Sequence, residues 1–425
     1  MSLGQPFWWD DAPPQTRSGK LPASVDVLVV GAGYTGLSAA LTLARDGRSV
    51  LVCEAETIGY GASSRNGGHV GAKLRRGMSS IAAEHGHETA RGIWSMARAS
   101  RAYIQDLIAA EGIDCSFEPC ARFYGAHKPK DYDGIAKSAE LLNKELDYGL
   151  EMVGRADQTK YVNTDAYFGG LVDRTTAAFH PAKYVNGLLE SVERAGGRVL
   201  SHTPVTGIDR SPGSGFVVHT PAGKVAARNV IVATNGYSGK AIPEIRRRMI
   251  PIGSYIIATD PMPKDRARAL MPACDLVIDS RRCASYMRIS PDKTRIMYGG
   301  RVAATDISPE LSGPRLKAVL DTIFPGIKDV GFSHVWMGFT GFTFDELPHI
   351  GQHDNGLYYA MGYCGSGTAM STYLGHKVAL KILGKPEGRT ALDGVPFQTK
   401  SFYGGSPWFL SSIIAGYRIL DRFRL

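Results

Sequence analysis

Cysteine is scarce in this chain, and the cysteines present lack the spacing of a metal site or a redox pair. Six occur among 425 residues, at positions 53, 115, 120, 274, 283 and 364, and none belongs to a C-x-x-C pair. The 11 histidines form no metal-ligand cluster with them. This pattern excludes a disulfide-rich secreted scaffold and favours reduced thiols. We therefore predict no metal site and a cytoplasmic location.

The sequence also lacks a recognisable targeting or membrane-spanning segment. The N-terminal stretch "MSLGQPFWWDDAPPQ" has no basic region followed by an apolar one, so it is not expected to be a signal peptide. The stretch Val25–Ala44 is nearly free of charge, but glycines cluster within it and Asp26 interrupts its first apolar run. Both features argue against a transmembrane helix.

Long runs of one charge sign are missing as well. Lysine and arginine number 49 against 40 aspartates and glutamates, and this formal net charge of +9 would attract an anionic partner. The basic residues are dispersed, however, apart from short clusters such as Arg246–Arg248. A solvated basic surface is therefore favoured over a nucleic-acid site, and no nucleic-acid partner is expected.

What the chain does contain is a set of strand–turn–helix units at its start, middle and end, with strand-rich segments between them. A chain of this length is too long for one simple core, so two domains are expected. These features predict an α/β fold, with a discontinuous Rossmann-like cofactor-binding domain and a mainly antiparallel β substrate domain with helices. The predicted ranges are 20–100, 170–240 and 335–390 for the first domain, and 101–169 and 241–334 for the second.

Residues 391–425 are expected to form a C-terminal tail that packs on the body. The tail mixes aromatic residues with Arg418, Arg422 and Arg424. A packed closing helix is the favoured interpretation, and contact with a membrane or an electron acceptor is the alternative.

The most specific motif is "GAGYTG", residues 31–36, between an apolar run and a stretch of helix formers. In such a turn the first glycine makes the bend, the second lets the backbone approach a pyrophosphate, and the third permits close packing of helix on strand. An acidic residue about 20 positions further on binds a ribose diol. The unit predicts a dinucleotide, with FAD and NAD both open at this point. Its expected contacts are Gly31, Gly33, Tyr34, Thr35, Gly36 and Glu54.

Further segments carry a resemblance to a known family. They are "FWWDD", the loop "SSRNGG", "FHPAKYVNGLLESVERAGGRV", "VIVATNGYSG", "YMRISPDKTRIMYGGR", "WMGFTGFTFDELPHIG" and "MGYCGSGTAMSTYLGHKVA". In this order and spacing, the chain resembles the FAD-dependent D-amino-acid oxidase superfamily. Within it, the chain is most similar to the glycine and sarcosine oxidase branch, and there to the gamma-glutamylputrescine oxidoreductase-like group.

The resemblance implies FAD as the cofactor and adds contacts to it. In covalent members a cysteine precedes the segment corresponding to "TFDE" and bonds the flavin, whereas Gly338 stands there in this chain. A non-covalent FAD is therefore implied, and Cys364 is interpreted as a buried thiol without a role. The added contacts are Ala62, Ser63, Ser64, Arg65, Asn66, Gly67, Gly68, Val205, Ala233, Thr234, Asn235, Gly338, Gly365, Ser366, Gly367 and Thr368.

The resemblance also implies the reaction, oxidation of a C–N bond in a small amine or amino acid such as gamma-glutamylputrescine or sarcosine. A hydride passes to flavin N5, and water hydrolyses the resulting imine. The electrons then go to O2 or to another acceptor, so an oxidase and a dehydrogenase both fit, with Lys73 or Arg301 as a cation near the flavin. The alternative is a flavin-binding subunit of a larger complex that is inactive alone.

Four candidate catalytic residues lie on the predicted substrate side. His69 follows "RNGG", Tyr255 lies on "GSYIIAT", and Tyr286 and Arg288 alternate onto one face of "YMRIS". An arginine would suit a substrate carboxylate through bidentate bonds. The alternative interpretation of the tyrosines is packing, and that of the arginine is a surface ion pair. His180 is interpreted as a helix cap. Other enzyme classes lack support, because the sequence has no G-x-S-x-G, no H-E-x-x-H and no second dinucleotide turn.

Overall fold

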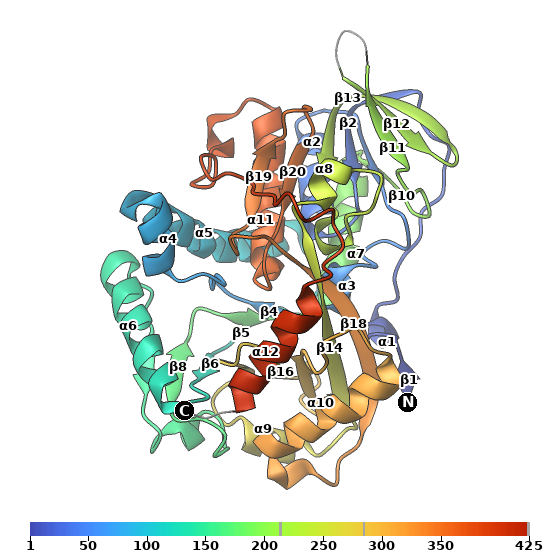
Figure 1. The fold of residues 1–425 in the computed structure, drawn as a ribbon. Coiled ribbons are helices and arrows are strands. Elements are labelled where there is room, and N and C mark those ends of the chain that lie inside the picture. The colour runs from blue at the N-terminus through green and yellow to red at the C-terminus, as the bar shows by residue number, and fades with distance from the viewer. Residues whose placement is uncertain (212–214, 284, 423–425) are drawn as a thin grey trace.

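A computed structural model describes residues 1–211, 215–283 and 285–422, and two large sheets dominate it (Figure 1). The first sheet has a parallel spine in the order β10, β3, β2, β13 and β20. β19 pairs antiparallel with β20, and β12 and β11 extend the sheet from β13. The strands are β2 (Ser24–Val30), β3 (Val50–Cys53), β10 (Arg198–Leu200), β11 (Gly207–Arg210), β12 (Phe216–Thr220), β13 (Gly223–Val232), β19 (His349–Gln352) and β20 (Tyr358–Met361).

Both faces of this sheet are buried. Val27 and Val29 pack against helices, whereas Leu28 and Val30 pack on the opposite side with β12 and with Ile245 of α8 (Pro243–Arg246). Burial on two sides explains why the first strand reads as a continuous apolar run without alternation. The helices on the first face are α2 (Tyr34–Arg45), α5 (His87–Glu111), α7 (Pro181–Arg194) and α11 (Gly367–Ile382).

The second sheet has nine strands and is mostly antiparallel. Its order is β1, β18, β14, β17, β16, β15, β6, β8 and β7. Its outer face packs on α10 (Pro309–Ile323) and α9 (Lys264–Leu270). The strands are β1 (Ser2–Leu3), β6 (Arg122–Gly125), β7 (Glu151–Val153), β8 (Gly170–Asp173), β14 (Ile250–Thr259), β15 (Leu276–Asp279), β16 (Ser285–Ile289), β17 (Ile296–Gly300) and β18 (Phe332–Phe342).

The inner face of the nine-stranded sheet meets the N-terminal segment and the loop after β3. Ile256, Met297 and Trp336 surround the fully buried Trp8 of α1 (Trp8–Asp11). The Trp8 indole N–H donates to the carbonyl of Asn66 at 2.9 Å. The remaining elements are α3 (Ala62–Arg65), α4 (Met78–His85), α6 (Pro129–Leu146) and α12 (Leu410–Arg422), with a small sheet of β4 (His69–Val70), β9 (Ala177–Ala178) and β5 (Glu118–Pro119).

The two sheets have the architecture that the sequence predicts, but three predicted domain boundaries differ. β8 and β18 were expected in the first domain and instead belong to the nine-stranded sheet, so the boundary at 334/335 cuts β18. The boundary at 100/101 falls inside α5, which is continuous and packs on α11. Buried strands of both sheets have similar apolar sequences, so only the pairing of a strand shows to which sheet it belongs. Among the described residues, no helix has the length and apolarity to cross a membrane.

Candidate active site

A cavity of about 440 Å³ opens at the carboxyl ends of β2, β3 and β13. Gly31, Cys53 and Ala233, which stand at those three strand ends, line it. This edge of an open α/β sheet is where ligands bind in such folds. The cavity continues past α3 to Thr340 on β18 and to the turn before α11. It therefore reaches from the first sheet to the nine-stranded sheet.

The glycine-rich turn between β2 and α2 forms one end of the cavity. Gly31 has a φ of +102°, a conformation that glycine adopts without strain. A Cβ at Gly33 would lie 2.8 Å from Ser63 Oγ, and a Cβ at Gly36 would lie 1.9 Å from the Gly31 carbonyl oxygen. Bare backbone at Gly31 and Gly33 lets a ligand approach the N-terminus of α2, which suits a pyrophosphate. Gly36 serves the packing of α2 on β2.

Glu54 lies on the cavity wall at the end of β3, held by two backbone donors. The Ala32 N–H donates to Oε2 at 2.7 Å and the Glu56 N–H donates to Oε1 at 3.1 Å. Burial raises the pKa of the Glu54 carboxyl, and these two donors oppose that shift. Val205 lies on the same wall. A fixed carboxylate in this position suits the diol of a ribose.

The other end of the cavity carries a buried hydroxyl without a partner. Asn235, with a φ of +44°, anchors the turn before α11, because its Oδ1 accepts the Gly362 N–H at 3.0 Å. Ser371 Oγ lines the cavity and is buried, yet it has no hydrogen-bond partner among the described residues. An unsatisfied buried hydroxyl costs about 1–3 kcal/mol, so this position indicates a polar ligand. The chemistry of the whole wall fits a long dinucleotide such as FAD.

Most of the predicted cofactor contacts line this cavity. Ser64 and Arg65 do not, because they point to the N-terminal segment. Ser64 Oγ accepts the Trp9 indole N–H at 3.0 Å, and the Arg65 guanidinium lies 4.6 Å from the Trp9 ring centroid. Gly36, Gly67, Gly68, Gly338 and Ser366 are also outside the wall. The residues on it are Gly31, Gly33, Tyr34, Thr35, Glu54, Ala62, Ser63, Asn66, Val205, Ala233, Thr234, Asn235, Gly365, Gly367 and Thr368.

Several wall residues were not among the predicted contacts. Tyr237 and Tyr363 had a usable signal, because they stand beside predicted contacts in "ATNGY" and "GYCGSG". Thr340 stands two positions after the predicted contact Gly338, on a strand of the other sheet. The missed residues are Val30, Cys53, Ala55, Glu56, Tyr60, Gly61, Pro204, Tyr237, Ser238, Gly239, Ala241, Ile242, Thr340, Tyr363 and Ser371.

The inner face of the nine-stranded sheet continues from the cavity, and we call this side of β18, β14, β17 and β16 the substrate face. Gly338 alternates onto it together with Thr340, and Ser254 lies opposite Gly338 in register. Ser254 Oγ is 3.0 Å from the hydroxyl of Tyr286. A Cβ at Gly299 would approach the Tyr286 ring to 2.2 Å, so this glycine makes room for the ring.

His69 meets Tyr286 at the substrate face. Their ring centroids are 5.9 Å apart, edge to face. Burial lowers the pKa of His69 well below 6.5, and the cations Arg288 and Arg122 lower it further, so the imidazole is neutral. Its Nε2 is buried and has no hydrogen-bond partner among the described residues. Burial raises the pKa of Tyr286 to about 12, so the phenol stays protonated.

The structure separates Tyr255 from His69 and Tyr286. Tyr255 neighbours Ser254 on β14 and therefore points to the opposite face of the sheet. There it packs in the core with α10, and the Ile307 N–H donates to its hydroxyl at 2.8 Å. The expectation that Tyr255 contacts substrate is corrected, because the strand's alternation turns it away.

Arg288 lies near the substrate face, but backbone carbonyls occupy its guanidinium. Nη1 donates to the carbonyl of Phe179 at 2.7 Å and of Gly68 at 3.2 Å, and Nε donates to that of Ile289 at 3.0 Å. Burial lowers the pKa of Arg288 to about 10. The side chain joins the loop after α3 to the segment before α7, a role different from the predicted grip on a substrate carboxylate.

The two cations considered for the flavin differ in their surroundings. Arg301 is neutralised by Asp306 at 2.8 Å and donates to the Gly253 carbonyl at 2.6 Å. The Lys73 ammonium lies 3.6 Å from the centroid of the Tyr124 ring, and burial lowers its pKa to about 7. Tyr124 shares the sheet face of Tyr286, since both lie opposite Ile278 in register. Of these two cations, Lys73 is therefore the one that lies on the same sheet face as Tyr286.

Two further residues have structural roles. The Cys364 thiol donates to the Gly362 carbonyl at 3.2 Å, and burial raises its pKa to about 12. His180 Nδ1 accepts the Lys183 N–H at 3.2 Å as the N-cap of α7, as the capping interpretation predicts. Among the described residues, no group of histidine, cysteine, aspartate or glutamate could hold a metal ion.

Comparison with known proteins decides the family. The family described as FAD dependent oxidoreductase matches residues 26–380. The chain belongs to this family. The cofactor and the oxidoreductase class that the sequence predicts are thereby confirmed.

Individual relatives of this FAD-dependent oxidoreductase share most of its length. Gamma-glutamylputrescine oxidoreductase from Escherichia coli (strain K12) is 34% identical over 372 residues, 87% of this chain and 86% of that protein. Glycine oxidase from Bacillus subtilis (strain 168) is 23% identical over 85% of this chain and 93% of its own. The crystal structure of glycine oxidase from Geobacillus kaustophilus matches the fold with a TM-score of 0.72, at 21% identity, over 89% of this chain and 99% of that one.

Proposed function

We propose that this FAD-dependent oxidoreductase oxidises the C–N bond of a small amine or amino acid, such as gamma-glutamylputrescine or sarcosine. The observation that carries the proposal is the continuity between the cofactor cavity and the substrate face, since Thr340 belongs to both. The names of the relatives support the substrate class, because gamma-glutamylputrescine and glycine both carry a primary amine. When bound, FAD takes a hydride from the carbon that bears the amine nitrogen.

The residues of the substrate face favour a neutral amine. Apart from Arg288, whose guanidinium donates to backbone carbonyls, its polar groups are His69 Nε2 and the hydroxyls of Tyr286, Ser254 and Thr340. The imidazole and the phenol are both uncharged at neutral pH, because burial lowers the pKa of His69 and raises that of Tyr286. An amine bound there keeps its lone pair, which assists loss of the hydride. Water then hydrolyses the imine.

A non-covalent FAD is part of the proposal. Gly338 carries no sulfur. A Cβ placed on Gly338 would lie 3.2 Å from the Cβ of Arg65. The Cys364 thiol is buried, protonated and engaged with the Gly362 carbonyl. Neither position therefore offers a thiolate that could bond the flavin.

The direct test is anaerobic addition of gamma-glutamylputrescine, sarcosine, glycine, proline and D-amino acids to the purified holoenzyme. Loss of the oxidised-flavin absorbance with one of these amines would establish the reaction and its substrate class. Readmitting air then separates an oxidase, whose colour returns, from a dehydrogenase, whose colour stays bleached. A yellow protein that no amine bleaches would argue instead for a flavin-binding subunit of a larger complex.

A matched pair of variants tests the substrate face itself. Tyr286→Phe removes the hydroxyl from this face and is expected to lower kcat/KM for the amine by about tenfold, the value of one hydrogen bond. Tyr255→Phe removes a hydroxyl from the opposite face of the same sheet and should leave kcat/KM unchanged. Equal effects of the two variants would contradict the assignment of the face.

A further inference from the structure

Exposed large hydrophobic side chains concentrate in the C-terminal tail. The described residues of this kind in the tail are 42–71% exposed, with Trp408 the most exposed, and they are Phe402, Trp408, Ile413, Ile419 and Leu420. Elsewhere in the described chain, the exposed residues of this kind are Met1, Leu3, Tyr60 and Leu311. Isolated exposed apolar residues need no explanation, whereas a contiguous group marks an interaction surface.

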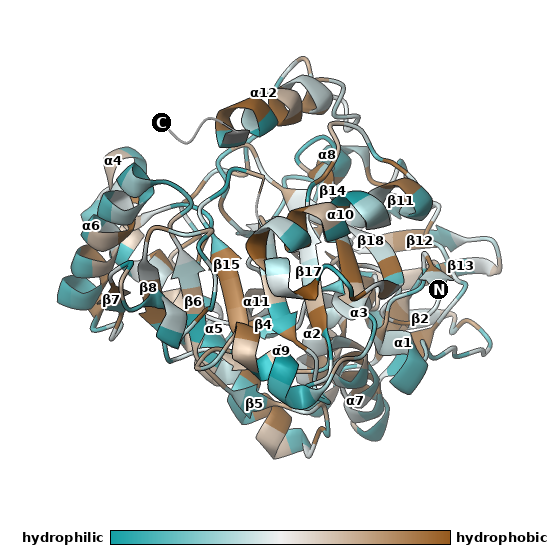
Figure 2. Cartoon of the chain, turned by 90° about the horizontal axis from the view of Figure 1, so that it is seen from below, coloured by the Kyte–Doolittle hydropathy of each residue, from teal (hydrophilic) through white to brown (hydrophobic). Residues whose placement is uncertain are grey.

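The group belongs to one side of an amphipathic helix. At helical spacing, one arc of α12 collects Ser412, Ile413, Ala415, Gly416, Ile419 and Leu420, none of which is charged. Ile414, on the other side, is only 6% exposed and faces the body. In Figure 2, α12 lies at the outer edge of the molecule, and much of its ribbon has the brown colour of hydrophobic residues. The apolar arc therefore points away from the fold.

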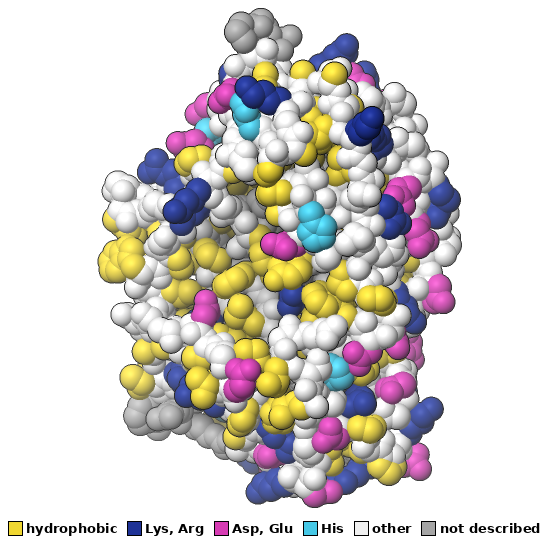
Figure 3. Space-filling model, turned by 90° about the vertical axis from the view of Figure 1, so that its right-hand side faces the viewer, with side chains coloured by type: hydrophobic (Ala, Val, Ile, Leu, Met, Phe, Trp, Pro, Cys, Tyr) yellow, Lys and Arg dark blue, Asp and Glu magenta, His cyan; other side chains and the backbone are white. Residues whose placement is uncertain are grey.

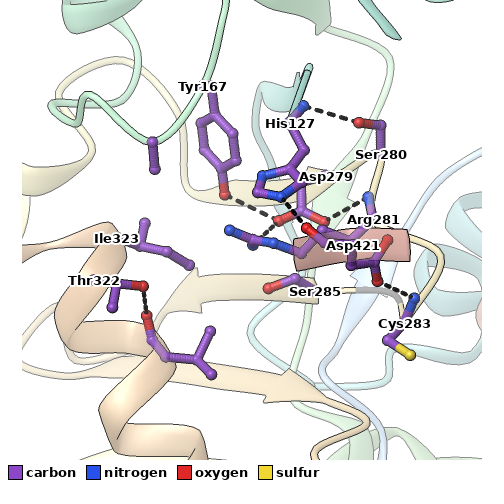
Figure 4. A network of polar contacts seen from close by, with 12 residues as sticks. His127, Tyr167, Asp279, Ser280, Arg281, Cys283, Ser285, Thr322, Ile323 and Asp421 are labelled. Carbon is purple, nitrogen blue, oxygen red and sulfur yellow. Dashed lines mark hydrogen bonds and ion pairs between the residues drawn. The ribbon is translucent and has the colours of Figure 1, made fainter. Parts of the chain in front are cut away.

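Polar contacts fix α12 in this orientation. The Asp421 carboxylate accepts the N–H groups of Arg282 and Cys283, each at 3.0 Å, as Figure 4 shows for Cys283. The Lys128 ammonium donates to the Leu420 carbonyl at 2.7 Å. Upstream, the Tyr403 hydroxyl donates to the Met249 carbonyl at 2.7 Å. The exposed arc thus belongs to a docked helix. Of the arginines that the sequence places in the tail, Arg424 and the side chain of Arg422 lie outside the described part.

Cations flank the apolar arc. Lys128 and Arg282 lie at one end, where Arg282 is 5.6 Å from the ring of Tyr417. Arg418 lies on α12 itself, and Arg246 donates to Ser406 Oγ at 3.1 Å beside the other end. The carboxylate of Asp421 accepts hydrogen bonds from the backbone N–H groups of Arg282 and Cys283. By contrast, the face in Figure 3 interleaves acidic and basic side chains.

We propose that α12 and residues 402–409 dock this enzyme on an anionic lipid surface. An uncharged apolar arc flanked by lysine and arginine is the pattern of a helix that lies in the plane of a membrane interface. A second copy of the chain fits less well, because a symmetric contact would bring the basic flanks of both copies together. The helix enters the headgroup region with Trp408, Ile413, Ile419 and Leu420, while the cations meet the phosphates.

The test is partition of the holoenzyme onto vesicles of phosphatidylcholine mixed equally with phosphatidylglycerol. Binding is expected on these vesicles, weaker binding at high salt, and little on pure phosphatidylcholine. Trp8, Trp94 and Trp336 are buried, and the half-buried Trp9 is held by Ser64 Oγ, so a shift of the tryptophan emission to shorter wavelength reports mainly the insertion of Trp408. A double variant, Trp408→Ser with Ile419→Ser, should lower the partition coefficient by about tenfold or more.

Matched controls distinguish this surface from others. Leu311→Ser removes a side chain that is 55% exposed outside the tail and should leave vesicle binding unchanged. Turnover with a soluble amine should also be unchanged in the double variant, because α12 lies outside the cofactor cavity. The proposal is overturned if wild type does not bind the anionic vesicles. It is equally overturned if wild type forms a dimer that the double variant disrupts, since the face would then belong to a second copy.

Discussion

Replacing Arg288 by methionine is expected to destabilise the fold rather than to weaken binding of one substrate class. The substitution removes the donors to the carbonyls of Phe179, Gly68 and Ile289, whose bonds measure 2.7, 3.2 and 3.0 Å. The Gly68 carbonyl keeps the Phe179 N–H at 3.1 Å, so two acceptors lose their donor. Each buried acceptor left without a partner costs about 1–3 kcal/mol, and partial relaxation reduces the sum, so the free energy of unfolding should fall by about 2–4 kcal/mol.

Urea unfolding followed by circular dichroism measures this change. Arg174→Met is the control, because Arg174 is an exposed arginine paired with Glu151, and its loss should change stability by about 1 kcal/mol or less. Arg288→Lys keeps one charged donor, so its loss of unfolding free energy should lie between those of Arg288→Met and Arg174→Met. The reasoning is refuted if Arg288→Met leaves the unfolding free energy unchanged while raising KM only for substrates that carry a carboxylate. That outcome would restore Arg288 as a substrate ligand.

Three further predictions concern the cofactor wall and the fold. Glu54→Gln removes a charged acceptor and should weaken FAD binding by about tenfold or more in a fluorescence titration; an unchanged Kd would contradict the ribose role. His180→Asn keeps the cap of α7 but removes a group whose folded pKa is about 3, against 6.5 unfolded. As the pH falls, the imidazole of His180 is protonated in the unfolded chain before it is protonated in the folded protein. Between pH 7 and pH 4, wild type should therefore lose about 3 kcal/mol more stability than the variant. Cys364→Ala should leave all flavin extractable by acid, as in wild type; flavin retained only by wild type would indicate a bond at Cys364.

The parts of the site that the sequence predicts are those set by neighbouring positions in the chain. Gly31, Gly33 and Glu54 belong to one strand–turn–helix–strand unit, so their spacing alone brings them to the same sheet edge. Tyr255 and Tyr286 could not be told apart in this way. Each lies on a strand, and which face a strand turns inward depends on its register, where a shift of one residue reverses every side chain.

Long-range partners account for the other differences. Arg288 bonds carbonyls that are 109 and 220 residues away in the chain, and no local pattern reports such contacts. The assignment of β18 to the nine-stranded sheet likewise follows from its pairing with β14. The aromatic N-terminus had a visible sequence signal, but its burial of Trp8 between loop and sheet depends on the assembled fold.

The central claim is that the cavity at the carboxyl ends of β2, β3 and β13 holds FAD. The most direct measurement is a titration of the deflavinated chain with FAD and, in parallel, with NAD, followed by flavin absorbance and by isothermal calorimetry. We predict that FAD saturates at one molecule per chain with a flavin spectrum shifted from that of free FAD, and that NAD gives no saturable binding. A chain that takes up no FAD, or that binds NAD in its place, would contradict the account.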